Sequence, residues 1–206
     1  MFKSIFKNLN GKWGKIDLEK ESKKTKGVNF SNPVECETWL NVLHKKKKID
    51  FSYGGFLKNR ENLWKNHYNS KKQIFVHEGM DFNVPLNTEV FLFEDGEVVE
   101  IIREPRLNGG WGNAVVFWMP KIKRYVIFAH MKKKLFVKKK RSYKKGQKIG
   151  LIGSRYENGN YFPHLHLQVM KPEFAAEYKR FKDVEGYSKK DSENLKNLDN
   201  PRKFVR

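Results

Sequence analysis

The chain has 206 residues and carries 43 Lys and Arg against 23 Asp and Glu, a formal net charge of +20. Its 14% aromatic content argues against global disorder, because large apolar rings can bury enough surface to offset the entropy of ordering. The longest apolar run, residues 114–119, is far shorter than the roughly 20 residues of a membrane-spanning helix. The single cysteine, Cys36, excludes an internal disulfide framework, so we expect one folded core without such bridges.

The first 30 residues are rich in lysine and predict an arm that is loosely attached to the core. The apolar residues Phe2, Ile5 and Phe6 are spread among polar ones, whereas a secretory leader needs an apolar stretch of roughly 7–15 residues. With no leader or membrane span visible, the sequence predicts a cytoplasmic protein. The alternatives are an exported or cell-envelope protein whose leader is absent from this chain, or export by another route.

A short helix is predicted over residues 33–44. Asn32 can cap it, Pro33 suits the first helical position, and Glu35 lies three residues beyond the cap. Apolar residues then recur at helical spacing, which favours packing on the core. We expect Cys36 to be a small buried hydrophobe in this helix rather than a nucleophile.

The middle of the chain changes to short segments rich in Val, Ile and Phe, separated by glycine turn signals. Seven strands are predicted, over residues 73–76, 88–93, 97–102, 114–119, 124–128, 148–152 and 162–170. Many short strands of this kind predict a mostly β fold, an antiparallel sheet or barrel-like sandwich with a few short flanking helices.

The ends of the chain differ from this middle part. Residues 172–182 return to helical spacing, and the last twenty or so residues are polar and expected to be irregular. The chain is therefore expected to divide into an N-terminal arm with its short helix (1–70), a β core (71–172) and a C-terminal helix with a polar tail (173–206).

Residues 121–148 contain thirteen Lys or Arg and no Asp or Glu. The stretch is either a solvated basic loop or a landing patch for an anionic polymer or a membrane surface. No helix-turn-helix, Cys/His finger or aromatic-glycine RNA signature accompanies it, so nucleic acid is not the expected partner.

Two histidines, His164 and His166, lie two residues apart in a predicted strand. Alternate residues of a strand share a face, so these imidazoles and Gln168 should point one way and the intervening apolar residues into the core. Further upstream, a strand end that turns back at Gly79 could bring His77 and Asp81 together. One carboxylate with imidazoles is a typical zinc ligand set, although a simple His–Asp hydrogen bond is the alternative.

The other histidines carry less information. His130 ends a predicted apolar strand, where it could face water. His44 and His67 are interpreted as ordinary surface or capping histidines.

These motifs, taken together and in this order, resemble the M23 (lysostaphin-like, LytM-type) zinc endopeptidases. The resemblance covers about residues 73–170 and rests on four motifs: His77-x-Gly79-x-Asp81, a strand ending at His130, Gly146-Gln147-x-Ile149-Gly150, and His164-Leu165-His166. Tyr53-Gly54-Gly55 with Arg60 upstream is similar to a leaderless subgroup of the family. The implied fold is a compact, mostly antiparallel β structure with a cleft over one sheet.

The resemblance also implies roles for individual residues. His77, Asp81 and His166 would ligate one Zn²⁺ per chain, and His130 and His164 would be the catalytic histidines, in an order of duty that stays open. A zinc-activated water would then hydrolyse a peptide bond. Gln168 departs from the family, in which Glu is common, and puts the orientation of the histidine ligand in doubt.

The resemblance implies a short peptide substrate, a peptidoglycan stem or cross-link peptide. Aromatic residues expected in loops near the cleft are Tyr53, Phe56, Trp111, Tyr156 and Tyr161. Of these, Tyr53, Trp111 and Tyr161 are the candidate substrate-binding residues, with ordinary loop packing as the alternative for each.

Three other readings remain open. The chain could be a catalytically silent member that binds cell wall or another anionic polymer, although the expected ligands and both histidines are present. Its charge alone would suit a nucleic-acid binder. The turn at residues 146–150 also resembles lipoyl-type and sugar-phosphotransferase carrier domains, but the lipoyl type lacks the histidine set.

Overall fold

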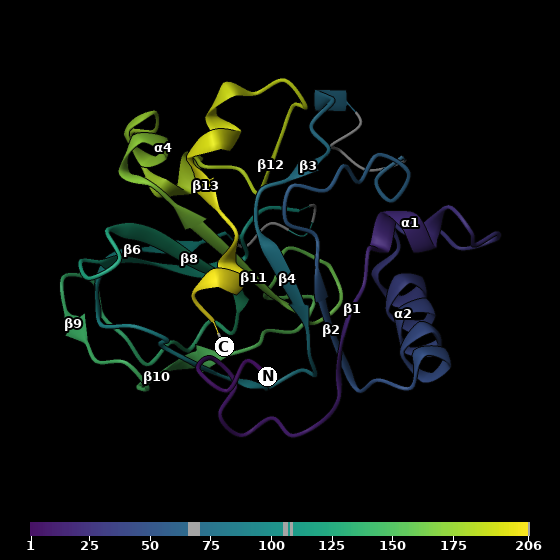
Figure 1. The fold of residues 1–206 in the computed structure, drawn as a ribbon, viewed down its shortest axis with the longest axis horizontal. Coiled ribbons are helices and arrows are strands. Elements are labelled where there is room, and N and C mark those ends of the chain that lie inside the picture. Colours follow the sequence, from purple (N-terminus) through teal and green to yellow (C-terminus); the bar gives the residue numbers. More distant parts are fainter. Residues whose placement is uncertain (66–70, 105–106, 108, 206) are drawn as a thin grey trace.

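The computed structural model describes residues 1–65, 71–104, 107 and 109–205, and it is built mainly of β-strands (Figure 1). The strands of the main sheet run from edge to edge as β1 (Trp13–Lys15), β2 (Phe51–Gly54), β4 (Met80–Asn83), β11 (Leu165–Met170), β8 (Arg124–Met131), β7 (Asn113–Met119), β6 (Gly96–Arg103) and β9 (Ser142–Tyr143), and β13 (Leu198–Asp199) also pairs with β11. The β1–β2 pair is parallel, and the other pairs in this sheet are antiparallel. The predicted mostly β, mostly antiparallel fold is therefore confirmed.

Two short ribbons complete the β structure. In one, β5 (Glu89–Phe91) pairs with β10 (Lys148–Leu151), and in the other, β3 (Val76–His77) pairs with β12 (Tyr187–Ser188). Both pairs are antiparallel, and they join segments that are far apart in the sequence. The second ribbon holds His77 against the C-terminal part of the chain.

The helices are few and short, as predicted. Within the described residues, those with assigned bounds are α1 (Leu18–Ser22), α2 (Pro33–Lys47), α4 (Pro172–Ala176) and the 3-10 turns η1 (Phe181–Asp183), η2 (Glu193–Asn197) and η3 (Pro201–Lys203). The Asn32 side chain accepts the backbone N–H groups of Val34 and Glu35, which confirms the predicted start of α2. In the described part of the chain, no helix has the length and apolarity to cross a bilayer.

The end of α2 lies beyond the predicted residue 44, because the helix continues to Lys47 and stops where Lys48 adopts a left-handed conformation at φ +54°. Cys36 is fully buried in this helix, as predicted, and burial raises the pKa of its thiol to about 12. Figure 1 shows α1 and α2 next to each other at one edge of the molecule, where Lys47 forms an ion pair with Glu21 at 3.0 Å.

The expectation of a loosely attached arm over residues 1–30 is wrong. Phe2, Ile5 and Phe6 are at most 1% exposed and belong to the main hydrophobic core. The Phe2 ring lies 4.9 Å from that of Trp13 and 5.0 Å from that of Phe82, in edge-to-face contacts that favour aromatic pairs. The spread of apolar residues among lysines is a helical-turn pattern that anchors this segment.

The C-terminal tail is also more ordered than expected. Its strand β13 extends the pairing of β11, and Val205 is fully buried in the same core as Phe2. The predicted helix over residues 172–182 is shorter, since α4 ends at Ala176. The division of the chain at residues 70 and 172 stays a prediction, but strands from all three parts contribute to the main sheet.

The alternation of β11 follows its prediction. Leu165, Leu167 and Val169 are fully buried in the main core. Successive side chains of a strand point to opposite faces, so His166 and Gln168 lie on the other side of the sheet. The strand thus contributes to the core with one face and to the candidate site with the other.

Candidate active site

Strand pairing brings the three candidate metal ligands together. Asp81 in β4 lies opposite His166 in β11, and Gly54 of β2 lies opposite Asp81 on its other side. His77 ends β3, and only two residues, with a bend at Gly79, separate it from β4. His77 and His166, which are 89 residues apart in sequence, therefore meet over the middle of the main sheet.

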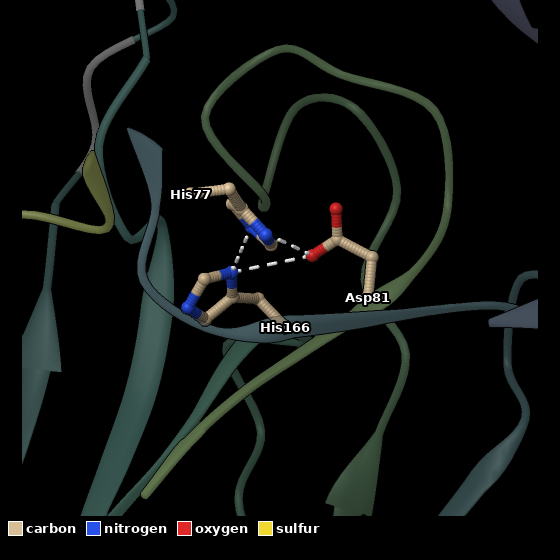
Figure 2. Close-up of side chains that lie close together, drawn as sticks. All are labelled: His77, Asp81 and His166. Atoms are coloured by element: carbon tan, nitrogen blue, oxygen red, sulfur yellow. Dashed lines mark hydrogen bonds and ion pairs between the residues drawn. The ribbon is translucent and has the colours of Figure 1, made fainter. Parts of the chain in front are cut away.

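The ligand atoms of these residues form a triangle whose sides suit a zinc ion (Figure 2). His77 Nε2 lies 2.9 Å from His166 Nδ1 and 3.3 Å from Asp81 Oδ1, and His166 Nδ1 lies 3.2 Å from the same oxygen. Ligands at ~2.0–2.1 Å from a tetrahedral ion are about 3.3 Å apart, so the three atoms can share one ion and leave a fourth position open. The residues present fit zinc, and each is at most 4% exposed.

Gly79 is required by the closeness of the two strands. A Cβ atom at this position would collide with the ring of His166 and would lie 2.8 Å from the carbonyl oxygen of Leu167. Only glycine lets the chain between His77 and Asp81 pass this close to β11.

Arg60 holds the second oxygen of Asp81. This buried guanidinium lies 2.7 Å from Asp81 Oδ2 and donates to the Tyr187 hydroxyl at 2.9 Å. Oδ1 is thereby left to face the two histidines. The sequence pattern pointed to Arg60 but not to its role. It gave no sign of Tyr187, because this residue lies in the polar tail for which an irregular structure is predicted.

The charges around the triangle favour the protonation states that bind zinc. Burial, together with the nearby charge of Arg60, lowers the pKa of His77 to about 3. Burial alone would raise the pKa of Asp81, but His77 and Arg60 outweigh it and hold that pKa well below its ordinary range. A neutral imidazole and an ionised carboxylate are the forms in which these side chains ligate a metal.

A buried hydrogen-bond chain orients His166 from behind. Its Nε2 lies 3.2 Å from Gln168 Oε1, and Gln168 Nε2 donates to Glu78 Oε2 at 2.9 Å. An amide oxygen only accepts, so Gln168 favours the tautomer in which Nε2 of His166 carries the proton and Nδ1 keeps its lone pair for a metal. Gln168 is itself held by Glu78, a 3% exposed carboxyl whose burial raises its pKa to about 8, and the orientation of His166 as a ligand stays a prediction.

His130 and His164 lie beside the triangle without belonging to it. Their ring centroids are 4.4 Å apart, and His164 Nε2 lies 3.9 Å from Asp81 Oδ1. His164 Nδ1 donates to the Phe162 carbonyl oxygen at 2.7 Å, so Nε2 is free to accept a proton. Burial lowers the pKa of both imidazoles, and their mutual proximity adds to the effect at His130.

The backbone of His130 is unusual. It adopts φ +66° at the penultimate position of β8, a conformation that is uncommon for residues other than glycine. Its N–H donates to the Trp111 carbonyl oxygen at 3.2 Å, and its own carbonyl oxygen accepts the Gly153 N–H at 2.9 Å. These contacts fix His130 at the cleft, instead of at an ordinary strand end.

Two cavities meet at this site. One, of about 280 Å³, is lined by His130 and His164 and extends to Tyr161. The other, of about 550 Å³, also touches His130 and extends to Trp111. His130 therefore lies where the two cavities join into one groove, with Tyr161 on one side and Trp111 on the other.

The expectation that Tyr53 lies in a loop near the cleft is wrong. Tyr53 is 5% exposed in β2, its ring packs 4.8 Å from that of Phe2, and it lines neither cavity. The position of β2 that lies opposite Asp81 is the neighbouring Gly54, so the Tyr53 side chain points to the other face of the strand. Phe56 is half-buried against the cores, and Tyr156 is 65% exposed with its ring beside Arg155, so neither lines these cavities.

Of the two remaining histidines, His44 lines neither cavity of the site. His44 is buried, and its Nε2 forms a hydrogen bond of 2.8 Å with the Ser52 hydroxyl, so the prediction of a surface or capping role is wrong. His67 falls outside the described residues.

Comparison with known proteins gives a family match over the same region. The model of peptidase family M23 matches residues 75–179, just over half of the chain. A curated relative, the peptidoglycan DD-endopeptidase ShyB of Vibrio cholerae, is 31% identical over 98 residues. That alignment covers 48% of this chain but only 21% of the relative, so the chain spans a small part of that protein.

Two solved structures are also similar. A zinc-containing peptidase from Vibrio cholerae is 29% identical, with 52% of this chain and 30% of that chain covered and a TM-score of 0.40. The catalytic domain of lysostaphin from Staphylococcus simulans is 22% identical, with 81% and 95% covered and a TM-score of 0.47. The region matched by the family model contains the three residues of the triangle and the two flanking histidines. This match shows that the chain belongs to peptidase family M23.

Proposed function

We propose that this chain is a zinc-dependent endopeptidase that hydrolyses peptide bonds in the stem or cross-bridge peptides of peptidoglycan. The observation that carries the proposal is the buried triangle of His77, Asp81 and His166 beside two further imidazoles in a groove. The name of the curated relative supports a peptidoglycan substrate. A zinc ion bound at the triangle would lower the pKa of a water molecule toward ~7 and polarise the scissile carbonyl.

The chain's own residues supply the proton chemistry. His164 is suited to accept the proton of the attacking water, because its Nδ1 is already committed to the Phe162 carbonyl oxygen and its Nε2 faces the triangle. His130, 4.4 Å away between ring centroids, is suited to donate a hydrogen bond to the oxygen that becomes negative during the attack. Arg60 fixes the Asp81 carboxylate, so that the site is preorganised before substrate arrives.

The groove offers contacts for a peptide on both sides of the site. The Trp111 ring lies 5.3 Å from that of His166, and its indole N–H donates to the Val184 carbonyl oxygen at 2.7 Å, so it is a rigid wall. On the opposite side, the Tyr161 hydroxyl is 2.9 Å from the Cys36 thiol. We propose Trp111 and Tyr161, but not Tyr53, as substrate-binding residues.

The direct test is metal analysis followed by digestion of purified sacculi and mass spectrometry of the released fragments. We expect one zinc per chain and fragments with newly formed peptide termini. A protein that holds stoichiometric zinc but releases no fragments from sacculi or short stem peptides would instead be a silent, wall-binding member of the family.

Two variants separate the proposed roles. His166→Ala should lose zinc, because it removes one of three ligands, whereas His164→Ala should keep zinc and lose turnover by about 10²–10⁴-fold. Cys36→Ser is the control, because this thiol contacts Tyr161 but not the triangle, and it should leave turnover unchanged. If His164→Ala also releases the metal from a folded protein, the assignment of ligand and proton acceptor is reversed.

A further inference from the structure

The basic stretch at residues 121–148 is not uniform in the structure. Four of its cations are neutralised by ion pairs: Lys121 with Glu94, Arg124 with Asp199, Lys144 with Asp95, and Lys148 with Glu89. The loop between β8 and β9 differs, because residues 132–141 carry six Lys and one Arg, and none of these side chains forms an ion pair within the described residues. Glu157 accepts the Lys133 backbone N–H at 3.0 Å and feels the charge of Lys132.

This basic loop is held in place by its backbone. The N–H groups of Lys132 and Phe136 donate to carbonyl oxygens of β10 and the N–H of Lys140 donates to one of β6, at 2.8–3.0 Å. Val137 is 6% exposed and belongs to the main core, so it anchors the middle of the loop. The cationic side chains therefore project from a fixed frame.

An aromatic residue stands among these charges. Phe136 is 41% exposed, although the two residues beside it are more buried, and the ammonium of Lys148 lies 5.0 Å from its ring centroid. Three lysines precede Leu135 and three lysines with an arginine follow Val137. An exposed apolar side chain flanked by unpaired cations matches the layered chemistry of a lipid interface, where anionic headgroups lie above an apolar phase.

We propose that residues 132–141 form a docking loop for anionic lipid bilayers, with Phe136 inserted among the headgroups. A soluble phosphate polymer would satisfy the cations but would offer Phe136 no apolar phase, so we assign lipid as the partner. The loop begins two residues after His130, so docking would hold the groove close to the bilayer. The proposal does not depend on the zinc chemistry.

The test is co-sedimentation of the full chain with vesicles of phosphatidylcholine alone or with about one third phosphatidylglycerol. We expect binding to the anionic vesicles only, decreasing as salt is raised. Each lysine near an anionic surface contributes about fivefold in affinity, so Lys138→Gln, Lys139→Gln and Lys140→Gln together should weaken binding about 100-fold. The matched control removes three exposed charges elsewhere, as Lys26→Gln, Lys45→Gln and Lys46→Gln, and should weaken binding far less.

Phe136 distinguishes lipid from polymer. Phe136→Ala should weaken vesicle binding about three- to tenfold, and Phe136→Leu should restore most of it, because leucine keeps an apolar side chain. Thermal unfolding and cleavage of a small peptide should be unchanged in these variants. Three outcomes would each overturn the proposal. The first is no vesicle binding at low salt, and the second is an equal loss of binding in both triple variants. The third is a higher affinity for soluble polyglycerol phosphate than for vesicles, unchanged when Phe136 is replaced.

Discussion

Replacing Gln168 with leucine tests how the hydrogen-bond chain behind His166 controls the proposed metal site. In the metal-free protein, His166 can carry its proton on Nδ1, where Asp81 Oδ1 lies 3.2 Å away. Zinc requires that Nδ1 be unprotonated, so the proton must move to Nε2, which faces Gln168 Oε1 at 3.2 Å. In Gln168→Leu, this N–H would point at a methyl group.

The magnitude follows from that unsatisfied group. A buried donor without a partner costs about 1–3 kcal/mol, and here most of the cost arises only when zinc binds. Zinc affinity should therefore fall by about 5- to 150-fold, in line with the roughly 10- to 100-fold effect of other groups that orient ligands. The free energy of unfolding of the metal-free protein should change less, apart from the lost Gln168–Glu78 hydrogen bond of 2.9 Å.

The assay is a competition titration of zinc against a fluorescent chelator, with chemical denaturation of the metal-free protein in parallel. Gln147→Leu makes the same replacement at an exposed glutamine in a turn and serves as the control. A zinc affinity of Gln168→Leu within twofold of the unchanged protein, with normal folding, would refute the assigned direction of these hydrogen bonds.

Three further outcomes are expected. Arg60→Met should lower the free energy of unfolding by about 3–5 kcal/mol in urea titrations, because it leaves the Asp81 carboxylate buried without its charged partner at 2.7 Å. A loss below about 1 kcal/mol would contradict this. Phe2→Ala should cost about 3–5 kcal/mol in the same assay, whereas a loosely attached arm would show almost no change. The metal-free protein should also be most stable near pH 6.5. Below that pH the unfolded chain binds a proton at His77, whereas the folded chain does not, because the pKa of His77 is about 3 in the folded state, so stability falls as the pH is lowered. Between pH 4.5 and about 8 the folded chain keeps a proton on Glu78 that the unfolded chain releases, so this group lowers stability as the pH is raised. His77 is joined below pH 6.5 by other buried histidines with lowered pKa, so stability should decline on both sides, and urea midpoints that rise steadily from pH 5 to pH 8 would disagree.

Much of the central sheet could be predicted from the sequence. The alternation of residues 164–170 predicted which face of β11 carries His166, and the cap at Asn32 predicted the start of α2. Both features depend on local patterns of two to four residues, which a single sequence displays directly.

The parts that could not be predicted depend on long-range pairing. Strands β1 and β13 have three and two residues, too few to show a period, and they are strands only because β2 and β11 offer them partners. The partners of the candidate ligands are equally non-local, since Arg60 meets Tyr187 across 127 residues. Such contacts leave no spacing for a sequence pattern to reveal.

The alternation of β11 has one more consequence. The same six-residue strand supplies leucines to the interior and a histidine to the groove, and it is bonded along both edges by β4 and β8. Neither imidazole nor leucine can be shifted alone, since a slip of a single position would exchange their sides at once. Under the proposed function, differences in substrate preference are thus expected to arise from the surrounding loops, because the strand holds His166 in one fixed register.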